Sequence, residues 1–431
     1  MALLDILVLV ISFLILLAIG VPIAWSIGAS TLVTMLISID SVPAFTTMAQ
    51  RIGTSLDSFT LLAIPFFILA GQIMNRGGIA SRLIALAKNL MGSLPGGLAH
   101  VNVVAAMLFG AVAGSAVAAV TAVGSVLGPR MEEEGYSKDF AAAVNITSST
   151  TGLLIPPSNV LIIYSLASGG VSIAALFVAG YIPGILTGLL LMIVAAIWAI
   201  RKDYPTGDRT TFKELFRSFL DAIPSLLLLI VVIGGIVAGI FTATEAAAVA
   251  VLYTIILGYY YNELSVKKLS ELFLESVKTT AIVMLLIGTS IAMSWILSYQ
   301  HIPQSISAAL LGLSNNPIVI LLMINFILLF VGTFMDMTPA ILIFTPIFLP
   351  IVTEMGMDPT HFGIIMILNL CIGLCTPPVG SILFVGVGVA KTSIVKVVRP
   401  LLPLFLAMIA ALILVTYFPQ LSLWLPSLFG L

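Results

Sequence analysis

Apolar runs of close to 20 residues, separated by short polar loops, recur from one end of this chain to the other. A run of about 20 apolar residues is long enough to cross a lipid bilayer as a helix. The composition agrees, because 60% of the 431 residues are hydrophobic and 8% are charged, whereas soluble domains carry about 25% charged residues. The sequence therefore predicts an all-α polytopic membrane protein that lies in a lipid bilayer and has no nucleic-acid partner.

About ten full crossings are predicted from these runs. No basic n-region precedes the first run, so we expect a retained helix there and not a cleaved signal. Segments 79–91 and 265–276 mix charged and apolar residues, which predicts helices that lie along the membrane interface. The predicted crossings lie near 3–19, 22–39, 59–75, 139–167, 172–200, 221–241, 243–261, 278–299, 361–390 and 400–418.

Two further apolar stretches, 98–129 and 317–350, are each interrupted midway. The sequence GAVAGSAV (110–117) divides the first stretch, and VGTFMDMTP (331–339) divides the second. Each half is expected to be too short to cross a bilayer. We therefore predict a re-entrant helical hairpin for each stretch, with its interruption at the hairpin tip.

The basic residues are distributed unevenly over the predicted loops. With the N-terminus outside, every Lys and Arg except Arg51 falls on one side of the membrane. Loops rich in Lys and Arg stay in the cytoplasm. We therefore expect an N-terminus on the periplasmic side of a bacterial inner membrane.

The two halves of the chain are related by a repeat. The segment GLLIPPSN (152–159) returns as GLCTPPVG (373–380), an offset of 221 residues that also aligns Ser115 with Asp336. An odd number of predicted crossings, five, precedes the second copy, so the two copies have opposite orientations. Inverted repeats with broken helices are typical of secondary transporters, whose sites lie near the bilayer midplane.

The paired prolines in the two repeated segments predict helix breaks, because proline lacks a backbone donor and clashes with the preceding turn. The carbonyl groups freed at a break must face protein, water or an ion. Neutral oxygens from NITSSTTG (145–152) lie directly before the first break. We therefore predict two sodium sites, one between each hairpin tip and the break of its own repeat. Their expected residues are Gly114, Ser115, Thr151, Gly152 and Pro156 in the first, and Gly332, Thr333, Asp336, Thr376, Pro378 and Gly380 in the second. The alternative is that the breaks are simple kinks whose hydroxyls bond the preceding turn.

Two acidic residues, Asp336 and Glu245, lie within long apolar stretches. An intramembrane carboxylate is a candidate functional group, and for Asp336 we expect a role with the cation or the substrate. Glu245 follows Thr242 in the sequence TATE, which predicts a helix capping box. Cys371 and Cys375 are expected to be packing residues, and His361 is expected in an outside loop at the surface.

Seven segments resemble the large membrane subunit of tripartite ATP-independent periplasmic (TRAP) transporters, and the resemblance extends over nearly the whole chain. They are LLAIPFFILAGQIMNRGG (61–78), AGSAVAAVTAVG (113–124), GLLIPPSN (152–159), FTATEAAAVAV (241–251), VGTFMDMTPAILIFTPIFLP (331–350), DPTHFG (358–363) and GLCTPPVG (373–380). The resemblance implies sodium-driven uptake of an organic acid by an elevator mechanism. It also implies a periplasmic substrate-binding protein and a small four-helix membrane subunit, here expected as a separate polypeptide. By motif position, Ser115, Asp336, Ser158 and Asn159 are the expected substrate-binding residues.

The repeat and the resemblance together predict five regions. They are first-repeat scaffold and arm helices (1–91), the first half of the transport domain (92–171), linking and second-repeat scaffold helices (172–312), the second half of the transport domain (313–393) and a C-terminal helix (394–431).

Several alternatives are open at the level of sequence. A primary pump is disfavoured because the chain has no G-x-x-x-x-G-K-[ST] loop, and a membrane enzyme because it has neither H-E-x-x-H nor a nucleophile elbow. The segment 145–170 is most similar to sialic acid transporters, which makes sialic acid the first substrate guess. A C4-dicarboxylate or another sugar acid, or a stand-alone sodium/carboxylate symporter without a binding protein, are the alternatives.

Overall fold

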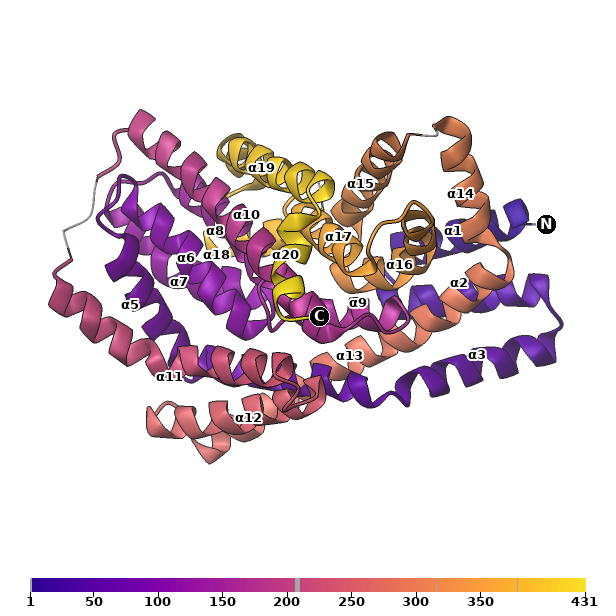
Figure 1. Ribbon diagram of the computed structural model, residues 1–431, viewed down its shortest axis with the longest axis horizontal. Coiled ribbons are helices and arrows are strands. Elements are labelled where there is room, and N and C mark those ends of the chain that lie inside the picture. Colours follow the sequence, from indigo (N-terminus) through magenta and orange to yellow (C-terminus); the bar gives the residue numbers. More distant parts are fainter. Residues whose placement is uncertain (1, 206–209, 315, 378) are drawn as a thin grey trace.

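The computed structural model describes residues 2–205, 210–314, 316–377 and 379–431, and this part of the chain is built of helices (Figure 1). Helices satisfy their own backbone hydrogen bonds, which is why an apolar chain of this kind folds into them in a bilayer. The first half of the chain contains α1 (Ala2–Ala18), α2 (Ile23–Ser38), α3 (Ser41–Leu56), η1 (Phe59–Leu62), α4 (Ala63–Arg76), α5 (Ile79–Met91), α6 (Gly97–Ala113), α7 (Ala116–Glu133), α8 (Lys138–Ser149), η2 (Thr151–Leu153), α9 (Asn159–Ala167) and α10 (Ile173–Arg201). The second contains α11 (Phe212–Val237), α12 (Ala243–Tyr260), α13 (Val266–Tyr299), α14 (Ile302–Leu313), α15 (Pro317–Phe334), α16 (Met337–Glu354), α17 (Pro359–Leu374), α18 (Ser381–Val389), α19 (Ile394–Tyr417) and α20 (Gln420–Leu428).

The predicted repeat is present in the helix boundaries. Adding 221 to the bounds of α7 gives the bounds of α16, and the residues that precede the two helices, Ser115 and Asp336, are equivalent N-caps. The N-caps of α8 and α17, Ser137 and Asp358, obey the same offset. The helices in each half therefore begin in equivalent places although most of the side chains differ.

The predicted crossings are present, with differences in their limits. Eight helices among the described residues are long and apolar enough to span a membrane, while α1 and α2 are apolar but shorter. The predicted crossings at 139–167 and 361–390 are each divided, into α8, η2 and α9 in the first and α17 and α18 in the second. The helices α3, α14 and α20 were not predicted; they contain 16, 12 and 9 residues, too few to be recognised as crossings.

One predicted interfacial helix is wrong. Residues 265–276 do not form a separate helix but continue without a break into the predicted crossing at 278–299, giving the 34-residue helix α13. No Gly or Pro interrupts the junction, so nothing in the backbone ends the helix there. The other predicted interfacial segment, 79–91, forms α5.

Both predicted hairpins are present as pairs of helices joined by a short turn. The arms of the first, α6 and α7, contain 17 and 18 residues, and both arms of the second, α15 and α16, contain 18. These arms are longer than expected, and by length alone α15 and α16 could cross a bilayer. In Figure 1 the first hairpin lies in the left half of the molecule and the second in the right half.

The broken helix of each repeat packs against the hairpin of the other repeat. The helix after the first break, α9, packs against α16 of the second hairpin, and the helix after the second break, α18, packs against α7 of the first. The centre of this arrangement is apolar: α17 is buried along almost its entire length, and Phe109, Phe140 and Phe348 are fully buried. His361, expected at the surface, is 1% exposed in the first turn of α17, because the helix begins there and carries it into the interior.

Candidate functional site

The tip of the first hairpin is formed by Gly114 and Ser115. Gly114 has a positive φ of +59°, which ends α6, and Ser115 begins α7 by accepting a hydrogen bond at 3.3 Å from the backbone N–H of Ala118. A Cβ atom added to Gly114 would lie 3.5 Å from the carbonyl oxygen of Pro157. The first hairpin tip therefore lies against the first helix break, as the sequence predicts.

The first break itself is also as predicted. Helix α8 ends at Ser149, a short 3-10 turn follows, and the chain then leaves helical structure until α9 begins at Asn159. Gly152 in this turn lies directly on Gly110 of α6, since a Cβ atom at Gly152 would be 2.3 Å from the Gly110 Cα atom. This approach of two backbones fixes the hairpin arm against the broken helix.

The second hairpin is arranged in the same way. Helix α15 ends at Phe334 and α16 begins after Asp336. A Cβ atom at Gly373 would lie 2.6 Å from the Cα atom of Gly332, so the second arm packs on the second broken helix through two glycines as well. The hydroxyl of Ser381, the first residue of α18, faces the carboxylate of Asp336.

Both tips line a single cavity of about 570 Å³. Gly114 and Ser115 come from the first tip, Asp336 from the second, and Asn159 from the helix after the first break. The hairpins and broken helices, distant in sequence, thus bring predicted residues of both proposed ion sites to one space. The other described residues predicted to bind sodium or substrate do not line the cavity: they are Thr151, Gly152, Pro156, Ser158, Gly332, Thr333, Thr376 and Gly380. Pro378 lies outside the described residues.

The hydroxyl groups near the breaks divide into two kinds. Thr151, Thr333 and Thr376 each donate to a carbonyl of the preceding turn, at 2.6, 3.0 and 2.7 Å. Bonds of this kind are expected if the breaks are simple kinks, the alternative to ion sites. Each hydroxyl oxygen nevertheless keeps a lone pair that could bind a cation. By contrast, the buried Ser158 Oγ and Asn159 Oδ1 atoms have no hydrogen-bond partner in the described part of the chain. Both oxygens have free lone pairs, which can accept a hydrogen bond or bind a cation.

Asp336 has no cationic partner. The two ion pairs among the described residues are Arg76–Glu275 and Lys138–Glu132, and neither includes Asp336. Asp336 is exposed to the cavity that both tips line, and a carboxylate within a membrane protein is costly unless a cation or hydrogen-bond donors compensate its charge. The geometry therefore leaves Asp336 available to a mobile cation.

Glu245 and the cysteines have the structural roles that the sequence predicts. The Thr242 hydroxyl accepts from the Glu245 N–H at 3.3 Å, and a Glu245 carboxylate oxygen accepts from the Thr242 N–H at 2.8 Å, which is a capping box. Cys371 and Cys375 are buried free thiols.

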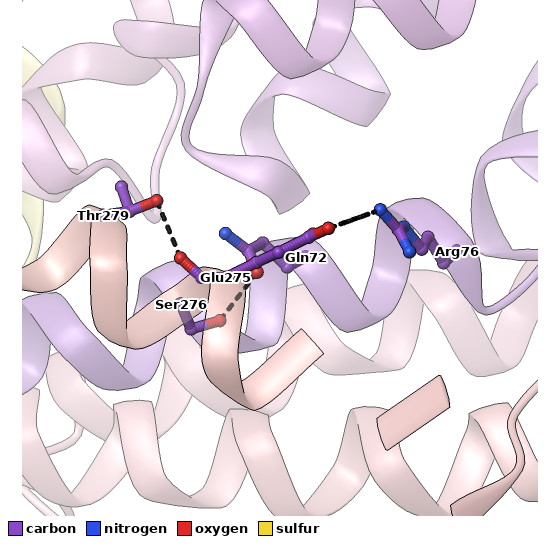
Figure 2. Close-up of polar contacts among 5 residues, drawn as sticks. All are labelled: Gln72, Arg76, Glu275, Ser276 and Thr279. Atoms are coloured by element: carbon purple, nitrogen blue, oxygen red, sulfur yellow. Dashed lines mark hydrogen bonds and ion pairs between the residues drawn. The ribbon is translucent and has the colours of Figure 1, made fainter. Parts of the chain in front are cut away.

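Polar residues that the sequence argument missed line the cavity on α4 and α13 (Figure 2). A guanidinium nitrogen of Arg76 donates to both carboxylate oxygens of Glu275, at 2.9 and 3.1 Å. The hydroxyl of Ser276 donates to the Gln72 side chain at 2.7 Å. Arg76 was interpreted only as one of the cytoplasmic charges, yet its spacing of four residues from Gln72 places both on one face of α4, and that spacing could have identified it.

Comparisons with known proteins agree with this architecture. The family described as "Tripartite ATP-independent periplasmic transporter, DctM component" matches residues 10–421. The chain is 57% identical over 419 residues to the uncharacterized protein YgiK of Salmonella typhimurium, covering 97% of this chain and 96% of YgiK. It is 39% identical over 411 residues to the sialic acid TRAP transporter large permease protein SiaM of Vibrio cholerae, covering 95% and 96% of the two chains.

A solved structure has the same fold. The YdaH transporter of Alcanivorax borkumensis superposes with a TM-score of 0.65, covering 90% of this chain and 89% of YdaH, at 15% sequence identity. At that identity the likeness concerns the fold alone, whereas the match over 10–421 concerns the family. The chain therefore belongs to the DctM family, the large membrane subunit of bacterial tripartite ATP-independent periplasmic transporters, and is a permease and not an enzyme.

Proposed function

We propose that this permease takes up a small organic acid anion together with sodium. The observation that carries this proposal is the meeting of both hairpin tips in one cavity, where the Asp336 carboxylate has no cationic partner in the described part of the chain. Carboxylate, hydroxyl and amide oxygens suit a hard cation such as Na⁺, while half-helix N-termini suit an anion. The same cavity can therefore receive both ions of a symport reaction.

The relatives support the substrate class. Relatives 42%, 39% and 41% identical to the chain are named as permeases for isethionate, sialic acid and C4-dicarboxylates respectively. All three compounds are small organic acid anions. Sialic acid is the first substrate to test, on the similarity of residues 145–170, and a C4-dicarboxylate or another sugar acid is the alternative.

We assign the two sodium sites to the two hairpin tips. Ser115 lies at the first tip, with the Pro157 carbonyl and Asn159 against it, and two oxygens of the adjoining break, those of Ser158 and Asn159, have no protein partner among the described residues. Asp336 dominates the second, with the hydroxyl of Ser381 at the start of α18 beside it. The hairpins and the broken helices form the carrier of an elevator mechanism, moving past the remaining scaffold helices.

Ser158→Ala should raise the stability of the sodium-free protein by about 1 kcal/mol, because it removes a buried hydroxyl that has no partner. The same change should abolish part of the stabilisation that sodium produces. Both effects can be measured by thermal unfolding of the purified protein with and without NaCl, using choline chloride to keep ionic strength constant.

The matched control is Ser165→Ala on the same helix. The hydroxyl of Ser165 is bonded to the Val171 carbonyl at 2.5 Å, so its removal should lower stability and leave the sodium effect intact. Undiminished stabilisation of Ser158→Ala by sodium would remove Ser158 from the first site.

The tripartite family supplies the expected partners: a small four-helix membrane subunit and a periplasmic substrate-binding protein. We place the permease in the bacterial inner membrane with a periplasmic N-terminus. Cysteine introduced at exposed Lys213 should therefore react with a membrane-impermeant maleimide only from the cytoplasmic side. The native thiols are buried and give little background. Labelling of this cysteine from the periplasmic side of intact cells would show that the topology is the reverse of the one proposed.

Uptake into proteoliposomes tests the proposed function. The permease is reconstituted with its small subunit, and labelled sialic acid, succinate or isethionate is supplied with the cognate binding protein under an inward sodium gradient. Uptake of one compound that needs both the gradient and the binding protein is the expected result. Equal uptake without the binding protein would indicate a stand-alone symporter, and a failure to take up any of these anions would contradict the proposal.

A further inference from the structure

The wall of the cavity that α4 and α13 form carries an ion pair that the hairpin sites do not use. Arg76 of α4 and Glu275 of α13 lie 199 residues apart in sequence and form an ion pair (Figure 2). Both line the cavity that Ser115 and Asp336 also line. Arg76 is the one Lys, Arg or His among the described lining residues. It is therefore the one side chain in this wall whose charge attracts an anion.

The pair is not needed to hold the two helices together. One turn earlier on α4, Gln72 accepts a hydrogen bond from the hydroxyl of Ser276, which is 4% exposed, so α4 and α13 are already joined by a partly buried hydrogen bond. The Arg76 and Glu275 side chains are 47% and 48% exposed. Ion pairs with this exposure contribute little stability and open readily.

The guanidinium group has unused binding capacity. Only its Nη2 atom bonds Glu275, and no other hydrogen bond of Arg76 occurs within the described residues. A guanidinium presents five N–H donors in a planar fork that matches a carboxylate. A substrate carboxylate can therefore approach Arg76 either beside Glu275 or in its place.

The pair also breaks the symmetry of the inverted repeat. With the repeat offset of 221 residues, the position equivalent to Glu275 is Thr54 and the position equivalent to Arg76 is Leu297. Neither equivalent residue is charged. By contrast, each of the two repeats has its own hairpin tip. A feature needed equally on both sides of the membrane would be expected in both repeats, so this one serves a single side of the transport path.

We propose that Arg76 and Glu275 form an exchangeable anion subsite, in which Arg76 binds the carboxylate of the substrate and Glu275 is the internal competitor that displaces it. The proposal rests on the uptake of an organic acid anion stated above. When the cavity is empty, Glu275 neutralises Arg76. When substrate leaves the hairpin tips, its carboxylate takes the place of Glu275 on the Arg76 guanidinium. Glu275 then binds Arg76 again, which displaces the substrate anion and releases it from the cavity.

Opposite effects of the two charges on substrate affinity are the signature of such exchange. Arg76→Gln should raise the apparent Kd by about tenfold, the loss expected for a charge-assisted hydrogen bond. Glu275→Gln should lower it by about threefold, since it removes the competitor in an exposed pair. The double variant should bind as weakly as Arg76→Gln alone, because Glu275 acts only through Arg76. Arg76→Lys, which keeps the charge but loses the fork, should lie between wild type and Arg76→Gln.

Equilibrium binding of labelled sialic acid, and separately of labelled succinate, to the permease with its small subunit in nanodiscs at saturating sodium measures these constants. Glu132→Gln is the matched control, because it removes the acidic partner of the Lys138–Glu132 pair outside the cavity, and its Kd should equal that of wild type. Uptake should show the second half of the exchange: Glu275→Gln should lower the maximal rate while tightening binding.

Two failures are distinguishable. If wild type takes up none of the tested anions, the proposed function fails and the subsite falls with it. If wild type transports normally but Arg76→Gln and Glu275→Gln change the Kd in the same direction, or not at all, the function stands and the pair is merely structural.

Discussion

Asp336→Asn is expected to raise the sodium concentration for half-maximal uptake by about 100-fold, since even residues that only support a metal ligand change metal affinity by about 10- to 100-fold. The substitution keeps the size of the side chain and one of its oxygens but removes the negative charge. Asp336 lies at the second hairpin tip, lines the cavity and has no cationic partner in the described part of the chain. Its charge is therefore the largest single attraction for a cation at that tip.

Sodium-dependent uptake in proteoliposomes, titrated with NaCl at constant ionic strength, measures this effect. Asp57→Asn is the control, because Asp57 is an exposed acidic residue at the end of α3 and does not line the cavity. Its sodium dependence should match wild type. An unchanged half-maximal concentration in Asp336→Asn would exclude this carboxylate from the sodium site.

Gly152→Ala is expected to destabilise the protein by about 3 kcal/mol and to abolish uptake. The added Cβ atom would lie 2.3 Å from the Cα atom of Gly110, where two stretches of backbone meet and no flexible side chain can move aside. Forcing extra volume into a packed interior typically costs about 1–3 kcal/mol, and backbone displacement places this case at the upper end. Gly373→Ala should act in the same way against Gly332 in the second repeat.

The matched control for these glycines is Gly128→Ala in α7. No atom lies within 4 Å of a Cβ atom at Gly128, and the residue is inside a helix. Alanine there should be neutral or stabilising by about 0.5–1 kcal/mol. Thermal unfolding of the three variants in one detergent gives the comparison, and a Gly152→Ala protein as stable as Gly128→Ala would mean that the hairpin and the broken helix are not packed as described.

The sequence predicted the hairpins, the breaks and the repeat because each is marked locally. The backbone conformation at each of these places is determined by residues that stand there. Helices end at Gly114 and at the Pro156–Pro157 pair, and they begin after the N-cap residues Ser115 and Asp336. The continuous α13 was missed for the opposite reason: its charged first turns look interfacial, but nothing there stops a helix.

The cavity wall could not be predicted in the same way. The Arg76–Glu275 and Gln72–Ser276 contacts join residues about 200 positions apart, and they depend on how α4 packs against α13. When the Lys and Arg residues of the loops are counted to predict topology, Arg76 is one cytoplasmic charge among many. From sequence, Ser158 and Asn159 are expected to bind substrate, and their orphaned oxygens could not be foreseen. Whether a hydroxyl bonds its own helix, as that of Thr151 does, depends on rotamers that the sequence does not specify.

Simultaneous entry of sodium and substrate is the most direct test of symport through converging hairpin tips. Proteoliposomes containing the permease and its small subunit would be supplied with the loaded binding protein, and ²²Na⁺ and labelled substrate counted together as the sodium gradient is varied. We expect a fixed ratio of sodium to substrate, and loss of the coupled sodium entry in Asp336→Asn. Accumulation of substrate without sodium entry, driven instead by a proton gradient, would contradict the account.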